Sequence, residues 1–436
     1  MLFLLITITA LLPISYCMFK KDIASPTFLF YIGFFISAVA AYFNYYTWNI
    51  HIQDRIIVIF LFGWISFFAG EYTIRVILAK KRFSNNLGNN RVKLKAIIPS
   101  RIVVYSLVLL NIVITILLFR EVVKVASFGG SSTDNLMVNF KENLDEVGLS
   151  GLITQLTKIT KASAYVFAFV FINNLIAAEK RTLKVVCKNI KYLIPIMLYI
   201  LQCFMRGGRY TVIALIIGML FIIYYLCQYK SNWRFKLSIK NLIILILIVF
   251  CIFLAFWLIK NVVGRTSESP FLEYITRYLG GPYELFSLYI ENPPESAYET
   301  FAGLLTSFNK IGLTNSTIRS YHEFRFSSTG ILIGNVYSAF RTYYNDYGLL
   351  GVCFFSYALS FIFNLSYHRI RVEKNLYKHS FRVIVYSAFL YCIVFAFFVD
   401  YFFARISLGL FIEVIIMYLV YYVVIKKRFY IGKNRK

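Results

Sequence analysis

The sequence predicts an all-α protein that crosses a membrane many times. Of its 436 residues, 59% are hydrophobic, and the mean hydropathy of +0.68 is typical of membrane proteins rather than of soluble cores. Eleven apolar runs are candidates for helices that cross the ~30 Å hydrocarbon layer. Lys and Arg residues gather in alternate segments between these runs, a distribution typical of multi-pass proteins. These observations predict about eleven transmembrane helices in a single membrane domain, residues 1–436.

The eleven runs are the elements on which the fold prediction depends. They cover residues 2–19, 27–47, 56–78, 101–119, 160–178, 192–205, 210–229, 241–260, 348–367, 383–399 and 406–425. Most are near the length of about 20 residues that a spanning helix needs. No basic residue precedes the first run and two lysines follow it, which is the reverse of a secretory signal, so we expect a retained helix.

The orientation follows from the positive charge. With the N-terminus outside, the inner segments are 20–26, 80–101, 179–191, 228–240, 368–382 and 426–436. They hold 29 of the 46 Lys and Arg residues and 3 of the 20 acidic residues, which accounts for the whole net charge of +26. Because Lys and Arg concentrate in cytoplasmic loops, we expect the N-terminus outside and the C-terminus in the cytoplasm. The basic loops then lie beside membrane lipid as orientation signals, and nucleic acid is not an expected partner.

The predicted outer face carries two long polar segments, an outer loop at 120–156 and a large outer, periplasmic loop at 261–347. Residues 331–347, at the end of the large loop, are too polar to span a membrane. Aromatic side chains recur there at helical spacing, at Tyr337, Phe340, Tyr344 and Tyr347. This pattern predicts an amphipathic helix along the outer interface.

A short polar turn with Arg206, Gly207, Gly208 and Arg209 separates two apolar runs. Glycine reaches φ > 0 without steric penalty, so the backbone can turn sharply, and two guanidinium groups over the turn can bind a phosphate-type dianion. The run before the turn rises only ~21 Å, which predicts that the turn lies below the outer surface in a polar cavity. The alternative is that both arginines anchor a helix end at the interface.

Arginine outnumbers lysine on the predicted outer face, by ten to six. The planar guanidinium group suits bidentate phosphate binding. Five arginines of the large outer loop are therefore predicted to bind the substrate, namely Arg265, Arg277, Arg319, Arg325 and Arg341.

Two residues of the large loop are candidate general bases. His322 is the one histidine in this loop, and deprotonating a sugar hydroxyl would be a natural role for it. The alternative is a solvated loop histidine. Asp346 is the rival base, and its own alternative is to end a helix or to pair with Arg341.

The sequence predicts neither a metal nor a cofactor. Glu142, Asp145 and Glu146 can share one helical face, as ligands of a divalent ion would. No Asp-x-Asp pattern occurs on the predicted outer face, so we expect a solvated acidic face instead. The sequence also lacks a Walker loop, a dinucleotide-binding glycine motif and a nucleophile elbow.

Two further features place charge inside predicted spans. Glu71 and Arg75 stand at i and i+4 of one helix, and we expect a structural ion pair. Glu413 lies in the middle of the last span, where it could relay protons or pair with a buried arginine. This second feature keeps a transporter as an alternative function.

The chain resembles the bacterial Wzy-type oligosaccharide repeat-unit polymerases, which extend O-antigen or capsule chains. The first matching motif is Gly207, Gly208 and Arg209 at the start of a span. The second lies at the end of the large loop, with Asn335, Tyr337, Tyr343, Asp346 and Gly348. About eleven helices and a large outer loop before the ninth accompany these motifs.

The resemblance implies a GT-C-like membrane glycosyltransferase of the bacterial inner membrane. Its donor would be a glycan linked through pyrophosphate to a polyprenyl lipid, and its acceptor a hydroxyl of a second lipid-linked repeat unit. Arg209 would stabilise the charge that develops on the leaving pyrophosphate, and Asn335 and Tyr337 would contact the substrate. A chain-length regulator protein is the partner with which such polymerases usually work. A lipid-linked oligosaccharide flippase and an O-antigen ligase are the alternative functions.

Overall fold

The protein is built almost entirely from helices. The computed structural model describes residues 1–80, 94–128, 136–178, 182–236, 238–260, 269–319, 321–373 and 375–427. In these ranges, eight helices are long and apolar enough to cross a membrane, and a bent pair of shorter helices forms a ninth candidate. Strands in the same ranges are limited to one two-stranded sheet. The chain thus has the all-α architecture of a multi-pass membrane protein, as predicted.

Three predicted spans take other forms in the structure. Helix α1 (Leu2–Met18) has 17 residues and is shorter than each of the eight candidate spans. The run at 192–205 belongs to the bent pair, whose two halves meet at 54°. The run at 383–399 is divided between α14 (Leu376–Phe389), the short helix α15 (Tyr391–Val394) and the non-helical residues that follow. The described residues therefore include eight long apolar helices and a bent pair, and the count of eleven spans stays a prediction.

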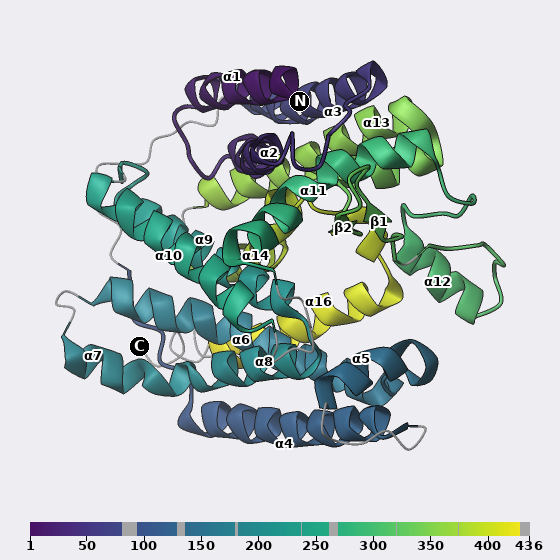
Figure 1. The fold of residues 1–436 in the computed structure, drawn as a ribbon. Helices are drawn as coiled ribbons and strands as arrows, with labels where there is room; N and C mark the ends of the chain where they lie inside the picture. The colour runs from purple at the N-terminus through teal and green to yellow at the C-terminus, as the bar shows by residue number, and fades with distance from the viewer. Residues whose placement is uncertain are drawn as a thin grey trace. The chain divides into compact units, whose positions relative to one another are not determined.

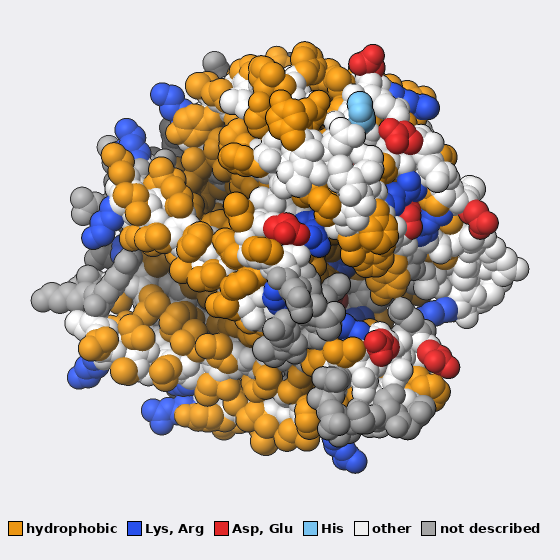
Figure 2. All heavy atoms as spheres, in the orientation of Figure 1, with side chains coloured by type: hydrophobic (Ala, Val, Ile, Leu, Met, Phe, Trp, Pro, Cys, Tyr) orange, Lys and Arg blue, Asp and Glu red, His pale blue; other side chains and the backbone are white. Residues whose placement is uncertain are grey.

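The surface is apolar over large areas. Hydrophobic side chains cover much of the face shown in Figure 2. In α10 (Ile239–Leu258), none of the 20 residues is buried, although nearly all of them are apolar. A helix that is apolar all round is stable only where its surroundings are apolar too, so α10 is suited to lipid.

The contacts between residues divide the chain into two compact units. Unit 1 consists of Met1–Asn85, Ser269–Glu373 and Phe389–Leu410, and unit 2 of Asn86–Glu268, Lys374–Ala388 and Phe411–Lys436. Each unit joins segments that are far apart in the sequence. No single linker divides the two units, which explains why the sequence shows no domain boundary.

Unit 1 contains residues 269–347 of the predicted large outer loop. Its elements are α1, α2 (Pro26–Phe43), α3 (Asp54–Lys80), α11 (Phe271–Glu291), α12 (Ala302–Lys310), β1 (Arg325–Phe326), β2 (Leu332–Gly334), α13 (Ala339–Arg371), α15 and η4 (Phe403–Arg405). Helix α13 packs along α3, and α11 packs on α2 (Figure 1). The described part of the segment 261–347 is therefore well structured, with two helices of its own and a small β-hairpin.

An aromatic cluster fixes the first turn of α13. Phe340 is buried and stacks on Phe34, with ring centroids 5.0 Å apart, and it meets Phe60 edge to face at 5.3 Å. Phe60 in turn stacks on Tyr283 of α11 at 4.7 Å. Such aromatic pairs contribute specific geometry in addition to buried area. The residue after Phe340 is Arg341, so this packing sets the position of a charged residue.

The amphipathic helix predicted at 331–347 is only partly present. Residues 332–334 form strand β2, and the helix begins at Ala339. Tyr337 thus lies before the helix, because the hairpin of β1 and β2 takes up the preceding residues. Gly348, at φ +59° and ψ −152°, then breaks the helical path within α13. Glycine adopts this conformation without the steric penalty of a side chain, so the break separates the polar first turns from the apolar remainder.

Unit 2 is a second group of packed helices. Its elements are α4 (Arg101–Ala126), α5 (Leu136–Val147), α6 (Gly151–Ala177), α7 (Leu183–Asn189), η3 (Ile190–Tyr192), α8 (Ile194–Met205), α9 (Arg209–Lys230), α10, α14, α16 (Leu408–Tyr421) and the π-helical turn η5 (Tyr422–Lys426). Helix α6 packs on α4, α8 and α9, and α5 packs on α4. The outer loop predicted at 120–156 is thus largely helical where it is described.

Buried charges in the spans of both units have partners. In unit 1, Glu71 pairs with Arg75 at 2.5 Å and also accepts a hydrogen bond from the Ser25 hydroxyl, which confirms the predicted structural pair. In unit 2, Glu413 pairs with Lys161 at 2.5 Å. The partner of Glu413 is therefore a lysine and not an arginine. Pairing of this kind offsets much of the penalty for removing each charge from water.

Candidate functional site

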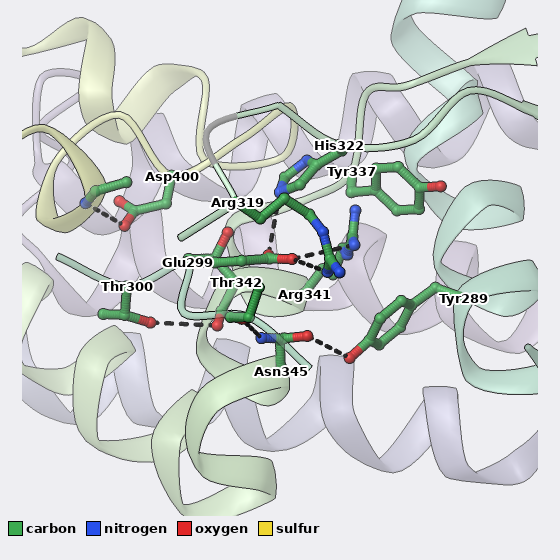
Figure 3. Close-up of polar contacts among 12 residues, drawn as sticks. Tyr289, Glu299, Thr300, Arg319, His322, Tyr337, Arg341, Thr342, Asn345 and Asp400 are labelled. Atoms are coloured by element: carbon green, nitrogen blue, oxygen red, sulfur yellow. Dashed lines mark hydrogen bonds and ion pairs between the residues drawn. The ribbon is translucent and has the colours of Figure 1, made fainter. Parts of the chain in front are cut away.

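Glu299 is the centre of a cluster of charged residues in unit 1 (Figure 3). It lies between α11 and α12 and is 2% exposed. One carboxylate oxygen, Oε1, accepts a hydrogen bond from Arg319 at 2.9 Å and lies 3.1 Å from Nη2 of Arg341. The other, Oε2, is 3.1 Å from Nε2 of His322. A buried carboxylate is costly unless it is paired, and here two arginines and a histidine contact it.

Arg341 joins two carboxylates in the same cluster. Its side chain is 0% exposed, and its Nη2 also donates to Oε2 of Glu323 at 2.9 Å. The guanidinium carbon lies 4.1 Å from the ring centroid of Tyr337 and 4.6 Å from that of Tyr289. This arrangement between two rings adds cation–π attraction to the ion pairs. Arg341 is thus held by packing on two sides and by charge at one edge.

Glu323 is the second carboxylate of the cluster and follows His322 in the chain. It accepts hydrogen bonds from the Tyr337 hydroxyl at 3.0 Å and from Nε of Arg325 at 3.0 Å. Burial alone would raise the pKa of Glu323, but the charge of Arg341 and these hydrogen bonds lower it to about 2. Glu323 is therefore ionised at neutral pH and balances the charge of Arg341.

Asp346 holds the backbone of the segment that carries Glu299. Its carboxylate accepts a hydrogen bond from the Thr300 N–H at 2.7 Å and from the Glu299 N–H at 3.2 Å. The neighbouring Asn345 donates to the Ala297 carbonyl at 2.8 Å. These contacts fasten the segment before α12 to the first turns of α13. The position of the Glu299 carboxylate therefore depends on Asp346.

The charge state of the pair between Glu299 and His322 follows from its surroundings. Burial would raise the pKa of Glu299, but the hydrogen bond from His322 and the charges of His322, Arg341 and Arg319 outweigh it, and the pKa is lowered. Burial lowers the pKa of His322, and Arg341 lowers it further, while Glu299 opposes both effects. At neutral pH, Glu299 is thus an anion and His322 a neutral imidazole.

This charge state fixes the tautomer of His322. An ionised carboxylate can only accept hydrogen bonds, so Nε2 of His322 carries the proton that is donated to Glu299. The lone pair of the ring is then on Nδ1, and no hydrogen bond from the described residues reaches this atom. A neutral histidine that is oriented by a carboxylate and has a free ring nitrogen is the arrangement of a general base.

The structure brings seven of the predicted site residues together in unit 1. They are Arg319, His322, Arg325, Asn335, Tyr337, Arg341 and Asp346. His322 is not a solvated loop histidine, since its side chain is only 9% exposed. The sequence prediction missed Glu299 and gave no role to Glu323. Glu299 lies 23 residues before its histidine partner, and no motif or spacing distinguishes it from the other acidic residues of the loop.

The predicted turn at residues 206–209 lies in unit 2 and has the expected shape. Helix α8 ends at Met205 with Arg206 as its C-cap, and Gly207 has a left-handed φ of +66°. The N–H of Gly208 donates to the Cys203 carbonyl at 2.9 Å, and that of Gly207 to the Phe204 carbonyl at 2.9 Å. This pair of bonds is the Schellman pattern that ends many helices, so the turn is a defined structure.

The two arginines of this turn have different surroundings. Arg206 is exposed, whereas Arg209 is 7% exposed. Nη1 of Arg209 donates to the Phe256 carbonyl at 2.8 Å, and its guanidinium carbon lies 3.9 Å from the centroid of the Phe256 ring. These contacts favour a role for Arg209 in fastening the end of α10.

The remaining predicted residues lie apart from the cluster around Glu299 or outside the described ranges. Arg277 pairs with Glu273 one turn earlier in α11 and donates to Ser269 at 3.2 Å. Arg265 lies at 261–268, outside the described residues. Within the ranges that the structure describes, no three His, Cys, Asp or Glu side chains gather as metal ligands would.

Comparisons with known proteins give no match for the chain. No protein-family model, no curated protein and no solved structure matches the chain. The assignment of a function therefore depends on the residues of the site themselves.

Proposed function

We propose that the protein is a membrane glycosyltransferase that polymerises lipid-linked oligosaccharide repeat units. It would transfer a glycan from polyprenyl pyrophosphate to a hydroxyl of another lipid-linked unit, at the outer face of the bacterial inner membrane, in O-antigen or capsule synthesis. The observation that carries the proposal is the buried pair of Glu299 and His322, with Nδ1 of the histidine available as a base.

The proposed reaction is a single displacement. The acceptor hydroxyl loses its proton to Nδ1 of His322 while its oxygen forms a bond to the anomeric carbon of the donor. The bond between that carbon and the pyrophosphate oxygen breaks, and the polyprenyl pyrophosphate leaves with the electron pair. Glu299 stabilises the imidazolium ion that forms, since a carboxylate beside a protonated ring favours the charged state.

The contacts in unit 1 change the proposed role of two arginines. Arg319 and Arg341 form ion pairs with Glu299, and Arg341 also pairs with Glu323. A guanidinium group that is already paired with carboxylates is a weak candidate for binding a substrate phosphate. We propose that both arginines keep Glu299 ionised and fix the position of its carboxylate.

The proposed setting is a GT-C-like membrane protein. The eight long apolar helices and the charge distribution support a multi-pass arrangement with the N-terminus outside. The proposed partners are membrane lipid, the lipid-linked oligosaccharides and a chain-length regulator protein. A flippase would need no general base, whereas a buried histidine oriented by a carboxylate is suited to removing a proton from a hydroxyl.

The surface glycan of a producing strain tests the proposed function. In a strain that makes long chains, loss of the gene should leave surface lipid that carries a single repeat unit. Gel electrophoresis of the surface glycan with and without the gene shows the ladder of chain lengths directly. If the surface units disappear altogether, the protein is a ligase or a flippase, and the proposal is wrong.

Replacement of Asp346 by asparagine tests whether this residue is a base or holds Glu299. We expect Asp346→Asn to retain polymerisation within about tenfold, because asparagine keeps one acceptor oxygen for the backbone N–H groups. Asp346→Ala removes both acceptor oxygens and should lower the rate further. Initial rates in isolated membranes provide the measurement. A loss of about 10²–10⁴-fold in Asp346→Asn would identify Asp346 as the base instead.

A further inference from the structure

Glu284 is a buried acid of unit 1 that has no part in the proposed mechanism. It lies in the second half of α11 and is 2% exposed. Its Oε2 atom is buried, and within the described residues the side chain has neither a hydrogen bond nor an ion pair. A carboxylate without a partner is strongly disfavoured in such a place, whereas the neutral acid is tolerated. The packed helix therefore favours the protonated form of Glu284.

The face of α11 that carries Glu284 packs against apolar elements. Residues three and four apart share a helix face, so Gly280 and Gly281 show what lies beside Glu284. A Cβ atom at Gly280 would be 2.5 Å from the backbone nitrogen of Ala41 in α2. One at Gly281 would be 3.1 Å from the Ile333 side chain in β2. Neither α2 nor β2 contains a charged residue, so neither element supplies a cation for an ionised Glu284.

The basic and titratable side chains of the segments beside α11 are directed elsewhere. They are Tyr31 and Tyr42 of α2, His51, Arg55 of α3, Arg277 of α11 and Arg325 of β1. The three arginines each have a ring or a carboxylate as partner. Tyr31 donates to the Trp64 carbonyl, and Tyr42 and His51 are exposed.

Acidic neighbours strengthen the preference for the protonated form. Glu291, two turns later in α11, acts on Glu284 by its negative charge, whereas Asp54 and Glu273 are exposed to solvent. Burial raises the pKa of Glu284, and the charge of Glu291 raises it further, to about 8. Glu284 is thus mainly protonated at neutral pH and ionises as the medium becomes alkaline.

A weak point of α11 lies directly before Glu284. Gly280, Gly281 and Pro282 follow one another inside the helix. Proline lacks the N–H group that would bond to the Tyr278 carbonyl, and helices commonly bend at proline and glycine. The half of α11 that begins at Pro282 can therefore move relative to the first half.

This second half of α11 supports the cluster around Glu299. The Leu288 carbonyl accepts a hydrogen bond from Arg325, and the Tyr289 ring lies 4.6 Å from the guanidinium carbon of Arg341. Arg341 in turn pairs with Glu299. A movement of the helix after Pro282 would therefore shift the groups that hold the Glu299 carboxylate.

We propose that Glu284 is a positioning residue that makes the site around Glu299 sensitive to pH. The neutral acid lets the second half of α11 stay packed on α2. The anion must gain water, so that half of the helix moves away and carries Leu288 and Tyr289 with it. The inference rests on the proposed function, because glycosyl transfer is the activity that this movement would slow.

The alkaline side of the pH profile tests the proposal with the purified full-length protein. Each pH unit above the pKa leaves about tenfold less neutral acid, so the wild-type rate of glycosyl transfer should fall about tenfold from about pH 9 to about pH 10. Glu284→Gln is a neutral side chain of the same shape, and Glu284→Met is an apolar one of similar length. The rates of both should change less than about twofold over this range.

The matched control is another glutamate of the same helix. Glu273 has a side chain that is 46% exposed. Glu273→Gln should therefore show the same alkaline decline as the wild type. Equal declines in the wild type and in both Glu284 variants would overturn the proposal.

Infrared spectroscopy detects the proton on Glu284 without any assay of transfer. A protonated carboxyl group has a C=O stretching band that is separate from the bands of a carboxylate. The difference spectrum between the wild type and Glu284→Gln should contain this band at about pH 7 and lose it by about pH 10. Absence of the band at neutral pH would overturn the proposal. A band that titrates in a protein whose gene has no effect on chain length would support the buried proton and reject the proposed function.

Discussion

Replacing His322 with glutamine is expected to lower the rate of glycosyl transfer by about 10²–10⁴-fold. Glutamine can still donate a hydrogen bond to Glu299, but it cannot accept a proton from the acceptor hydroxyl. The fold should therefore persist while the chemical step is lost. Formation of glycan chains from lipid-linked repeat units by the purified protein measures the effect.

The matched control for this variant is another histidine of unit 1. His51 is exposed, and the contact that involves it uses its backbone carbonyl, which accepts a hydrogen bond from Ser287. His51→Gln should therefore transfer glycan at the wild-type rate. Similar rates for His322→Gln and His51→Gln would show that His322 is not the base.

The pH dependence of the wild type adds an independent check on the same residue. The pKa of His322 is lowered from 6.5, so the imidazole is neutral above that pH and becomes protonated only as the pH falls through the lowered value. The rate should hence stay constant from about pH 8 to below pH 6.5 and decline under more acidic conditions. An acidic limb above pH 6.5 would contradict the environment described for His322.

Replacing Arg341 with methionine is expected to lower the free energy of unfolding by about 3–5 kcal/mol. The side chain is fully buried and lies between two tyrosine rings, and it neutralises Glu299 and Glu323. Methionine fills part of the space but leaves Glu323 with less compensating charge in a partly buried position. Denaturation by SDS in mixed micelles, followed by circular dichroism, gives the difference from the wild type.

An arginine of the same unit with a largely exposed partner supplies the comparison. Arg277 pairs with Glu273, whose side chain is 46% exposed. Solvent screens such a pair, so Arg277→Met should change the free energy of unfolding by only about 0–1 kcal/mol. Equal free energies of unfolding for the two variants would show that the cluster around Glu299 does not stabilise the fold, although it is buried.

The helices of the fold could be predicted from hydropathy because the hydropathy of a segment depends only on its own residues. The helices α3, α4, α6, α9 and α10 each contain a stretch of 18 residues that is apolar enough to cross a membrane. The run at 383–399 was predicted as one span because hydropathy records the polarity of a residue and not its backbone path. Asp400 follows that run and accepts hydrogen bonds from the N–H groups of Phe402, Phe403 and Ala404, which stabilises a tight turn there.

The site was less predictable because its key contact is not local. His322 was singled out by its chemistry, but its partner Glu299 is brought to it by the backbone contacts with Asp346. Phe301, with a left-handed φ of +60°, then turns the chain into α12. Phenylalanine has no preference for the left-handed conformation, so the sequence does not predict a turn at this residue. The sequence therefore indicated one half of the pair, and only the packing of α13 identified the other.

The packing of α13 along α3 has a consequence for synthesis. α3 ends at Lys80 and α13 begins at Ala339, so at ~5–20 residues per second the ribosome needs on the order of tens of seconds to supply the partner helix. During that interval Glu71 already has Arg75, Ser25 and the backbone N–H of Thr27 as partners. The nascent N-terminal segment can thus carry its buried charge in the bilayer on local contacts alone, before the helix that completes the unit exists.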